Sequence, residues 1–128
     1  MKLYFQIQNY NWHPERYKYS VEQMMLMLFP GERPEYPEGY APSDNEAVFA
    51  LDRGPDRTVV TAQVTRPEGT AQGETQVESR LLDEAPERVY HTLQHALKMA
   101  FYRAGTAVLG QEPPWGALTG AVSYTHLT

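Results

Sequence analysis

Two histidines, His91 and His95, stand four residues apart in a segment with helical periodicity, a spacing at which both imidazoles can bind one metal ion. On a helical wheel they lie beside Arg88, Lys98 and Tyr102, opposite the apolar face. No carboxylate follows at helical spacing on that stripe, and no Glu stands between the two histidines in metalloprotease position. We therefore expect a solvated face here and no metal site.

Three other groups of residues have types that occur in catalytic or ligand-binding sites. The segment Gly69–Gly73, GTAQG, has the glycines of a phosphate loop but lacks the Lys-Ser or Lys-Thr pair, so we expect a hairpin loop. Ser20, Ser43 and Ser79 have no His partner in a recognisable motif. Several carboxylates cluster in a proline-rich stretch, where solvation explains them. These are Glu32, Glu35, Glu38, Asp44 and Glu46. We predict no catalytic, cofactor-binding or metal-binding residue in this chain.

The first helix is predicted from Ser20 to about Phe29. Ser20 and Gln23 have the spacing of a capping box, Tyr19 and Met24 that of a hydrophobic staple, and the Pro-Gly pair that follows ends the helix. Its Met-Met-Leu-Met-Leu-Phe run is apolar on nearly every side, which indicates a helix covered from more than one direction. The Pro-rich stretch after it, Gly31–Asn45, is predicted to be a long spacer loop.

The remaining elements are strands and one long helix. Alternating apolar residues predict strands at Lys2–Gln8, Ala47–Asp52, Arg57–Thr65 and Glu74–Leu82. Short turns between the later strands favour an antiparallel meander. In the third strand one face is formed by Thr58, Val60, Ala62 and Val64.

The last helix begins near Pro86 and is followed by Gly110 as the residue that ends it. Its predicted buried face comprises Val89, Leu93, Ala96, Leu97, Ala100 and Ala104. Gly105 indicates close packing or an earlier end of the helix. The predicted fold is α+β, an antiparallel sheet of about four strands with two helices on one face, in the order β-α-β-β-β-α.

Composition narrows the possible partners. The 128 residues carry a net charge of −5, which argues against a nucleic-acid partner held through its phosphates. The longest apolar run, Met24–Phe29, is far below the roughly 18 residues of a membrane span. The start of the chain reads as a strand and not as a signal peptide, so we expect a cytoplasmic protein. There is no cysteine, and thiolate chemistry is therefore excluded for these residues.

Four segments resemble one enzyme family closely. They are MKLYFQIQNYNW (1–12), SVEQMMLMLFPGE (20–32), RVYHTLQHALKMAFY (88–102) and EPPWGALTG (112–120). Together they resemble the N-terminal region of the clostridial-type oxygen-independent coproporphyrinogen III oxidases, the coproporphyrinogen dehydrogenases of the radical S-adenosylmethionine superfamily. In that family the PPWGALTG segment continues as Val-Arg-Pro into a linker before the catalytic barrel.

The resemblance stops after Gly120. The last eight residues, AVSYTHLT, back-translate into a string that, apart from its first base, looks like a transposase-based sequencing adapter. We expect an accessory domain at 1–112, a linker at 113–120 toward a missing barrel, and an adapter-derived tail at 121–128. Trp115 in the linker has two interpretations that stay open, an anchor that docks the connector or a loop residue that covers the end of the last helix.

The resemblance implies a function for an intact parent protein. Such enzymes hold a 4Fe–4S cluster in a Cys-x3-Cys-x2-Cys motif, cleave S-adenosylmethionine, and convert coproporphyrinogen III to protoporphyrinogen IX in haem biosynthesis. With no cysteine here, the fragment alone is expected to be inactive, with its own missing catalytic domain as partner. Two alternatives remain: a related radical-SAM haem chaperone as the parent, or a stand-alone α+β binding module.

Overall fold

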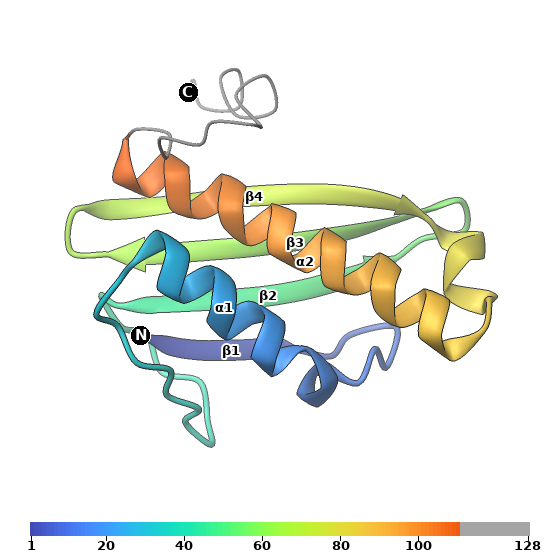
Figure 1. Cartoon of the computed structure of the whole chain (residues 1–128), viewed down its shortest axis with the longest axis horizontal. Coiled ribbons are helices and arrows are strands. Elements are labelled where there is room, and N and C mark those ends of the chain that lie inside the picture. Colours follow the sequence, from blue (N-terminus) through green and yellow to red (C-terminus); the bar gives the residue numbers. More distant parts are fainter. Residues whose placement is uncertain (111–128) are drawn as a thin grey trace.

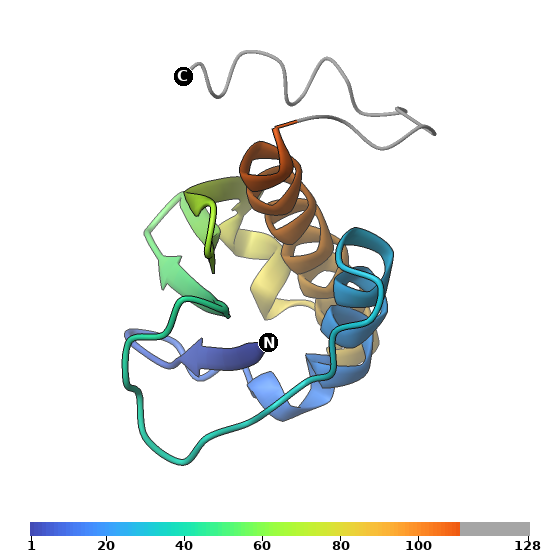
Figure 2. The same cartoon turned by 90° about the vertical axis from the view of Figure 1, so that its left-hand side faces the viewer.

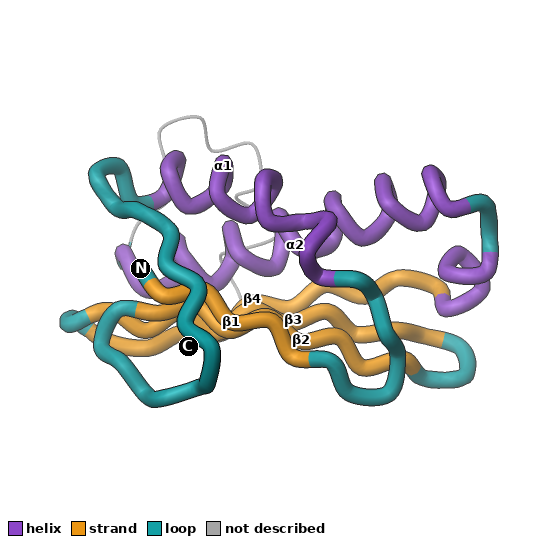
Figure 3. Tube along the Cα trace, turned by 90° about the horizontal axis from the view of Figure 1, so that it is seen from below, coloured by secondary structure: helices purple, strands orange, loops and turns teal. Residues whose placement is uncertain are grey.

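The computed structural model describes residues 1–110, and these form one mixed sheet with helices on one of its faces (Figure 1; Figure 3). The fold is α+β, as the sequence predicts. In chain order the elements are β1 (Lys2–Gln6), the short 3₁₀ helix η1 (Pro14–Tyr17), α1 (Lys18–Leu28), β2 (Glu46–Arg53), β3 (Arg57–Arg66), β4 (Gly69–Glu78), the 3₁₀ helix η2 (Ser79–Asp83) and α2 (Pro86–Leu109).

The strands lie in the order β1-β2-β3-β4, and one pair differs from the predicted antiparallel sheet. β2, β3 and β4 are antiparallel neighbours, but β1 is parallel to β2, with Lys2 opposite Glu46. The reason is the connection. A two-residue turn reverses the chain between β3 and β4, whereas α1 carries it back across the sheet between β1 and β2, so both strands run the same way.

The fourth strand begins earlier than predicted, at Gly69, so the GTAQG segment is part of β4 and not a loop. Arg66 pairs directly with Gly69, which leaves only two residues for the turn. Gly73 sits where α2 crosses the strand. A Cβ at Gly73 would collide with the backbone oxygen of Ala100 and lie 2.6 Å from the backbone nitrogen of Ala104. The absence of a side chain therefore allows the helix to approach the sheet closely.

The start of α1 also differs from the prediction. The helix follows directly on η1 and begins at Lys18, so Ser20 is inside it and caps nothing. The Ser20 hydroxyl is buried and accepts a hydrogen bond of 2.7 Å from Nε2 of Gln94 on α2. Tyr19 is 70% exposed and forms no staple with Met24. Pro14 favours the first turn of η1, so the helical segment begins before the predicted start at Ser20.

α1 and α2 run in parallel, side by side over the same face of the sheet (Figure 2). Ser20 meets Gln94 near one end, and Leu28 packs on Gly105 at the other. The predicted close packing at Gly105 is confirmed, and the helix ends as predicted before Gly110, which has φ 74°.

The core lies between the sheet and the helices. The predicted inward face of β3 is confirmed, and most of the predicted face of α2 is buried. Tyr102 was placed on the solvated face by the helical wheel, and this was wrong, because it is fully buried. α1 is covered by α2 and by the core, but its outer face is open within residues 1–110, since Leu26 is 46% and Met27 55% exposed. No helix in the described part of the chain is long and apolar enough to cross a bilayer.

Candidate functional site

The two histidines singled out in the sequence lie on the exposed side of α2. His91 contacts the ring of Tyr90 at 5.6 Å between centroids, and His95 is exposed on the next turn. Within residues 1–110, no group of three or more His, Asp or Glu side chains lies close enough to hold a metal ion. Arg88 makes an ion pair of 3.6 Å with Glu84, and neither histidine takes part in it.

The three serines have structural roles. Ser79 is buried between the start of β3 and the β2–β3 turn, where its hydroxyl lies 2.8 Å from that of Thr58 and donates to the carbonyl of Gly54 at 2.7 Å. The hydroxyl of Ser43 accepts from the backbone amide of Asn45 at 3.1 Å. These hydroxyls stabilise turns and helix contacts.

The carboxylates of the Pro-rich loop between α1 and β2 differ from one another in their surroundings. Solvation was expected to explain its carboxylates, and Glu38 and Asp44 are indeed exposed. Glu46, however, is 3% exposed and accepts hydrogen bonds from the hydroxyl of Tyr40 at 2.9 Å and from the amide of Ser43 at 3.0 Å. That expectation was wrong for Glu46, because the loop folds back over it.

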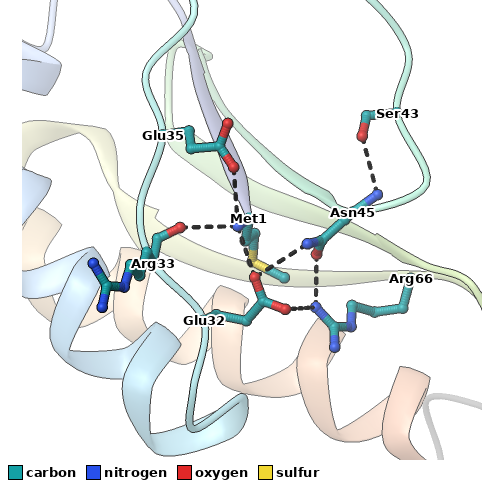
Figure 4. Close-up of polar contacts among 7 residues, drawn as sticks. All are labelled: Met1, Glu32, Arg33, Glu35, Ser43, Asn45 and Arg66. Carbon is teal, nitrogen blue, oxygen red and sulfur yellow. Dashed lines mark hydrogen bonds and ion pairs between the residues drawn. The ribbon is translucent and has the colours of Figure 1, made fainter.

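Glu32 lies at the centre of a second set of contacts, which we call the N-terminal cluster (Figure 4). The α-ammonium group of Met1 donates to Oε1 of Glu32 at 2.7 Å and to the carbonyl oxygen of Arg33 at 2.9 Å. The other oxygen of Glu32 accepts from Arg66 at 2.9 Å, and Asn45 bridges the two at 3.1 Å and 2.6 Å. The cluster thereby fastens the loop after α1 to the start of β1 and the end of β3.

The electrostatics of the N-terminal cluster follow from these contacts. Hydrogen bonds from the Met1 ammonium group, from Arg66 and from Asn45 lower the pKa of Glu32 to about 2. The carboxylate is therefore fully ionised at neutral pH. The guanidinium group of Arg66 also lies 4.6 Å from the centre of the Phe29 ring, so the cation is held on two sides.

Beside the cluster, the loop runs along the free edge of β1. Glu35 pairs with the strand for one residue, since its amide donates to Met1 at 3.0 Å and its carbonyl accepts from Leu3 at 2.9 Å. The next contact of a parallel ladder would need an amide hydrogen at Pro37, which has none. The pairing therefore stops there, and a groove opens beyond it.

We call this hollow the β1-edge groove, and its volume is about 370 Å³. Its walls are mainly aromatic. The ring of Tyr36 stacks at 6.3 Å on Phe5, and Tyr40 meets Tyr4 edge to face at 4.7 Å. The Lys18 ammonium group lies 4.3 Å from the centre of the Tyr36 ring. The groove is lined by Leu3, Tyr4, Phe5, Gln6, Lys18, Tyr36, Pro37, Glu38 and Tyr40.

The pKa values of two tyrosine hydroxyls in the groove, those of Tyr36 and Tyr40, are raised. Burial, together with a hydrogen bond donated to Glu22, raises the pKa of Tyr36. The hydrogen bond to Glu46 raises that of Tyr40. Aromatic rings, backbone groups of an edge strand and neutral phenols together are suited to binding. In the sequence, the only sign of this groove was the pair of tyrosines four residues apart among the prolines.

Several predictions fall on residues outside the described part of the chain. They are the linker at 113–120, the tail at 121–128 and the two interpretations of Trp115. The structure bears on none of them.

The chain was compared with known proteins in three ways. No family model matches it, and no curated protein matches it. Among solved structures, it is similar to the crystal structure of protein VC0702 from Vibrio cholerae, with 10% sequence identity and a TM-score of 0.43 over 93% of this chain and 96% of that one. A TM-score of this size does not establish a shared fold.

Proposed function

We propose that this chain is the N-terminal accessory region of an oxygen-independent coproporphyrinogen III oxidase of the clostridial type. The support for this proposal is the resemblance of four segments, at 1–12, 20–32, 88–102 and 112–120. The intact protein would decarboxylate two propionate side chains of coproporphyrinogen III oxidatively, and it would act in the cytoplasm.

The segments at 1–12, 20–32 and 88–102 are in contact in the folded chain, directly or through Tyr17, as parts of one domain would be. Tyr17, just before the second segment, stacks on Tyr90 of the third at 5.3 Å, and Gln94 donates to Ser20. The indole of Trp12 in the first segment donates to Gln6 at 3.0 Å and packs 5.9 Å from Tyr17.

The exposed side of α1 supports an accessory role. Leu26 and Met27 are half exposed, and Leu109 at the end of α2 is 38% exposed. Leu28 and Gly105 are in contact, so these apolar side chains lie at the same end of the helical layer, where the chain leaves α2. The occupant that we propose for this surface is the catalytic domain that would follow the linker.

In this proposal the chemistry belongs to the part of the parent beyond residue 120. S-adenosylmethionine bound to a 4Fe–4S cluster would supply the radical that abstracts hydrogen from a propionate side chain. The present chain has no cysteine, so its residues do not fit the cluster and no step is assigned to them.

Sequencing the source locus downstream of codon 120 tests the proposal directly. A continuation through Val-Arg-Pro into a Cys-x3-Cys-x2-Cys motif is the expected result. A radical-SAM barrel with the features of a haem chaperone would favour the first alternative. A native stop codon after the present C-terminus would overturn the proposal.

A stand-alone binding module is a second candidate function, and the β1-edge groove is the observation that favours it. An extended peptide could continue the ladder that Pro37 interrupts, with its side chains against Tyr36 and Tyr40. Titration with extended peptides, followed by nuclear magnetic resonance (NMR), is the test. Saturable shifts in β1 that are lost in Tyr36→Ala would support it, and their absence for all peptides would count against it.

A further inference from the structure

A second hollow, separate from the β1-edge groove, lies between η1 and the start of α2. Its volume is about 330 Å³, which is within the usual size of a small-molecule pocket. The apolar part of its wall is made by Trp12, Leu82, Pro86 and Val89. This wall can accommodate the apolar body of a small ligand.

The polar part of the wall contains a buried phenol. Tyr17 is 2% exposed, with its ring between Trp12 at 5.9 Å and Tyr90 at 5.3 Å. Within residues 1–110, its hydroxyl makes no hydrogen bond, and although the ring is buried, the oxygen itself is not fully enclosed. Burial, followed by the neighbouring Tyr10, raises the pKa of Tyr17 to about 12. The hydroxyl therefore keeps its proton at neutral pH and is available to donate a hydrogen bond.

Arg16 is the cation beside this phenol, and it affects the pKa of the Tyr17 hydroxyl more than the carboxylate of Glu15 does. Arg16 lines the same hollow, lies within electrostatic reach of the Tyr17 hydroxyl, and makes no ion pair with another described residue. The one carboxylate in the lining, Glu84, is paired with Arg88 at 3.6 Å. His13 is also at the rim, 3.9 Å from Glu15. A guanidinium group next to a phenol donor is a good arrangement for a carboxylate.

The adjoining helix end adds to this preference. α2 begins at Pro86, and its N-cap residue, Ala85, offers no side-chain hydrogen bond to the first turn. The first amides of the helix therefore have no side-chain cap, while Glu87 in the same turn offsets part of the positive charge of the helix N-terminus.

We propose that this hollow binds a small monocarboxylate with a flat apolar body. The carboxylate is held by the hydroxyl of Tyr17 and the guanidinium group of Arg16, and the body packs on Trp12, Leu82 and Val89. This inference does not depend on the proposed function, since it uses only Trp12 and residues of η1, η2 and α2.

Benzoate is a suitable probe, with benzamide as a neutral probe of the same shape. We expect ¹H–¹⁵N NMR spectra of the full chain to show saturable shifts around Tyr17 and Arg16 with benzoate, and binding of benzamide about tenfold weaker. Arg16→Gln should weaken benzoate binding about tenfold, and Tyr17→Phe several-fold. Arg33→Gln, in the distant loop, is the matched control and should leave the affinity unchanged.

Folding and binding are separated by a second measurement. Because the Tyr17 hydroxyl has no described partner, Tyr17→Phe should keep the melting temperature of the parent chain or raise it. Equal binding of benzoate and benzamide, or unchanged binding in both variants, would overturn the proposal. The absence of saturable shifts at tens of millimolar benzoate would do the same.

Discussion

The side chain of Leu28 occupies the space that a side chain at Gly105 would need. A Cβ at Gly105 would lie 2.6 Å from Cδ1 of Leu28, so the C-terminal ends of α1 and α2 are in contact without an intervening layer. We expect Gly105→Ala to destabilise the fold by about 1–3 kcal/mol through overpacking. Chemical denaturation of Gly105→Ala, Leu28→Ala and the double variant measures the coupling. A double variant that is simply additive would mean that the two residues do not compete for space.

The contact between β4 and α2 is less tolerant. At Gly73 the atoms that a Cβ would meet belong to the backbone of Ala100 and Ala104, which cannot move away as a side chain can. Gly73→Ala should therefore lower the free energy of unfolding by about 3 kcal/mol. Gly39→Ala is the control, because nothing lies within 4 Å of a Cβ at that position. Equal denaturation midpoints for the two variants would show that the helix and the strand can separate freely.

The lowered pKa of Glu32 predicts an acid-dependent loss of stability. Its pKa falls from 4.5 to about 2, so the carboxylate stabilises the fold above pH 4.5, and this contribution disappears as the pH falls to 2. Glu32→Gln should cost on the order of 2–3 kcal/mol at pH 7 and almost nothing near pH 2. Denaturation curves over this range test the point. Glu38→Gln, at an exposed position in the same loop, is the control and should leave the free energy of unfolding at pH 7 unchanged.

The ammonium group of Met1 is a structural component of the N-terminal cluster. Residues added before Met1 would turn it into a neutral amide and place new backbone beside Glu32 and Arg33. We expect such an extension to lower the free energy of unfolding by about 2 kcal/mol. The same residues added after Thr128 serve as the control. Identical melting temperatures for the two extended chains would mean that the Met1 ammonium group does not stabilise the fold.

The exposed side of α1 should respond to charge without losing stability. Leu26→Glu and Met27→Lys remove apolar surface that no described residue covers. We expect the free energy of unfolding to change by no more than about 0.5 kcal/mol, while self-association at high concentration decreases. Sedimentation velocity measures the association. A large destabilisation would mean that these side chains belong to the core of this domain.

The sequence predicted those features that depend on local periodicity. The buried faces of α2 and β3 follow from the spacing of residues such as Leu93, Leu97 and Val60, and the end of α2 from Gly110. The early start of β4 was missed because Gly69 and Gly73 are typical of loops when read alone. Only the register with β3 and the approach of α2 explain glycine there.

Long-range contacts could not be predicted in the same way. The parallel pairing of β1 with β2 depends on the path of α1, and the N-terminal cluster joins Met1, Glu32 and Arg66 across more than 30 residues in each step. Charged residues in a proline-rich loop have the same appearance in sequence whether they are solvated or paired. The hollow beside Tyr17 could not be predicted for the same reason, since η1 and α2 are brought together only by the fold.

The placement of β1 has a consequence for how the protein is made. Lys2 must pair with Glu46, 44 residues later, whereas Arg66 pairs with Gly69 only three residues away. During synthesis β1 is therefore the first of the described strands to leave the ribosome. More residues must be added before its partner strand is made than for any other pair of strands in the sheet. The N-terminal cluster is completed later still, because Arg66, which binds Glu32, follows β2. The β2–β3–β4 hairpins can form from local contacts, so we expect the N-terminal strand to join a sheet that is already assembled.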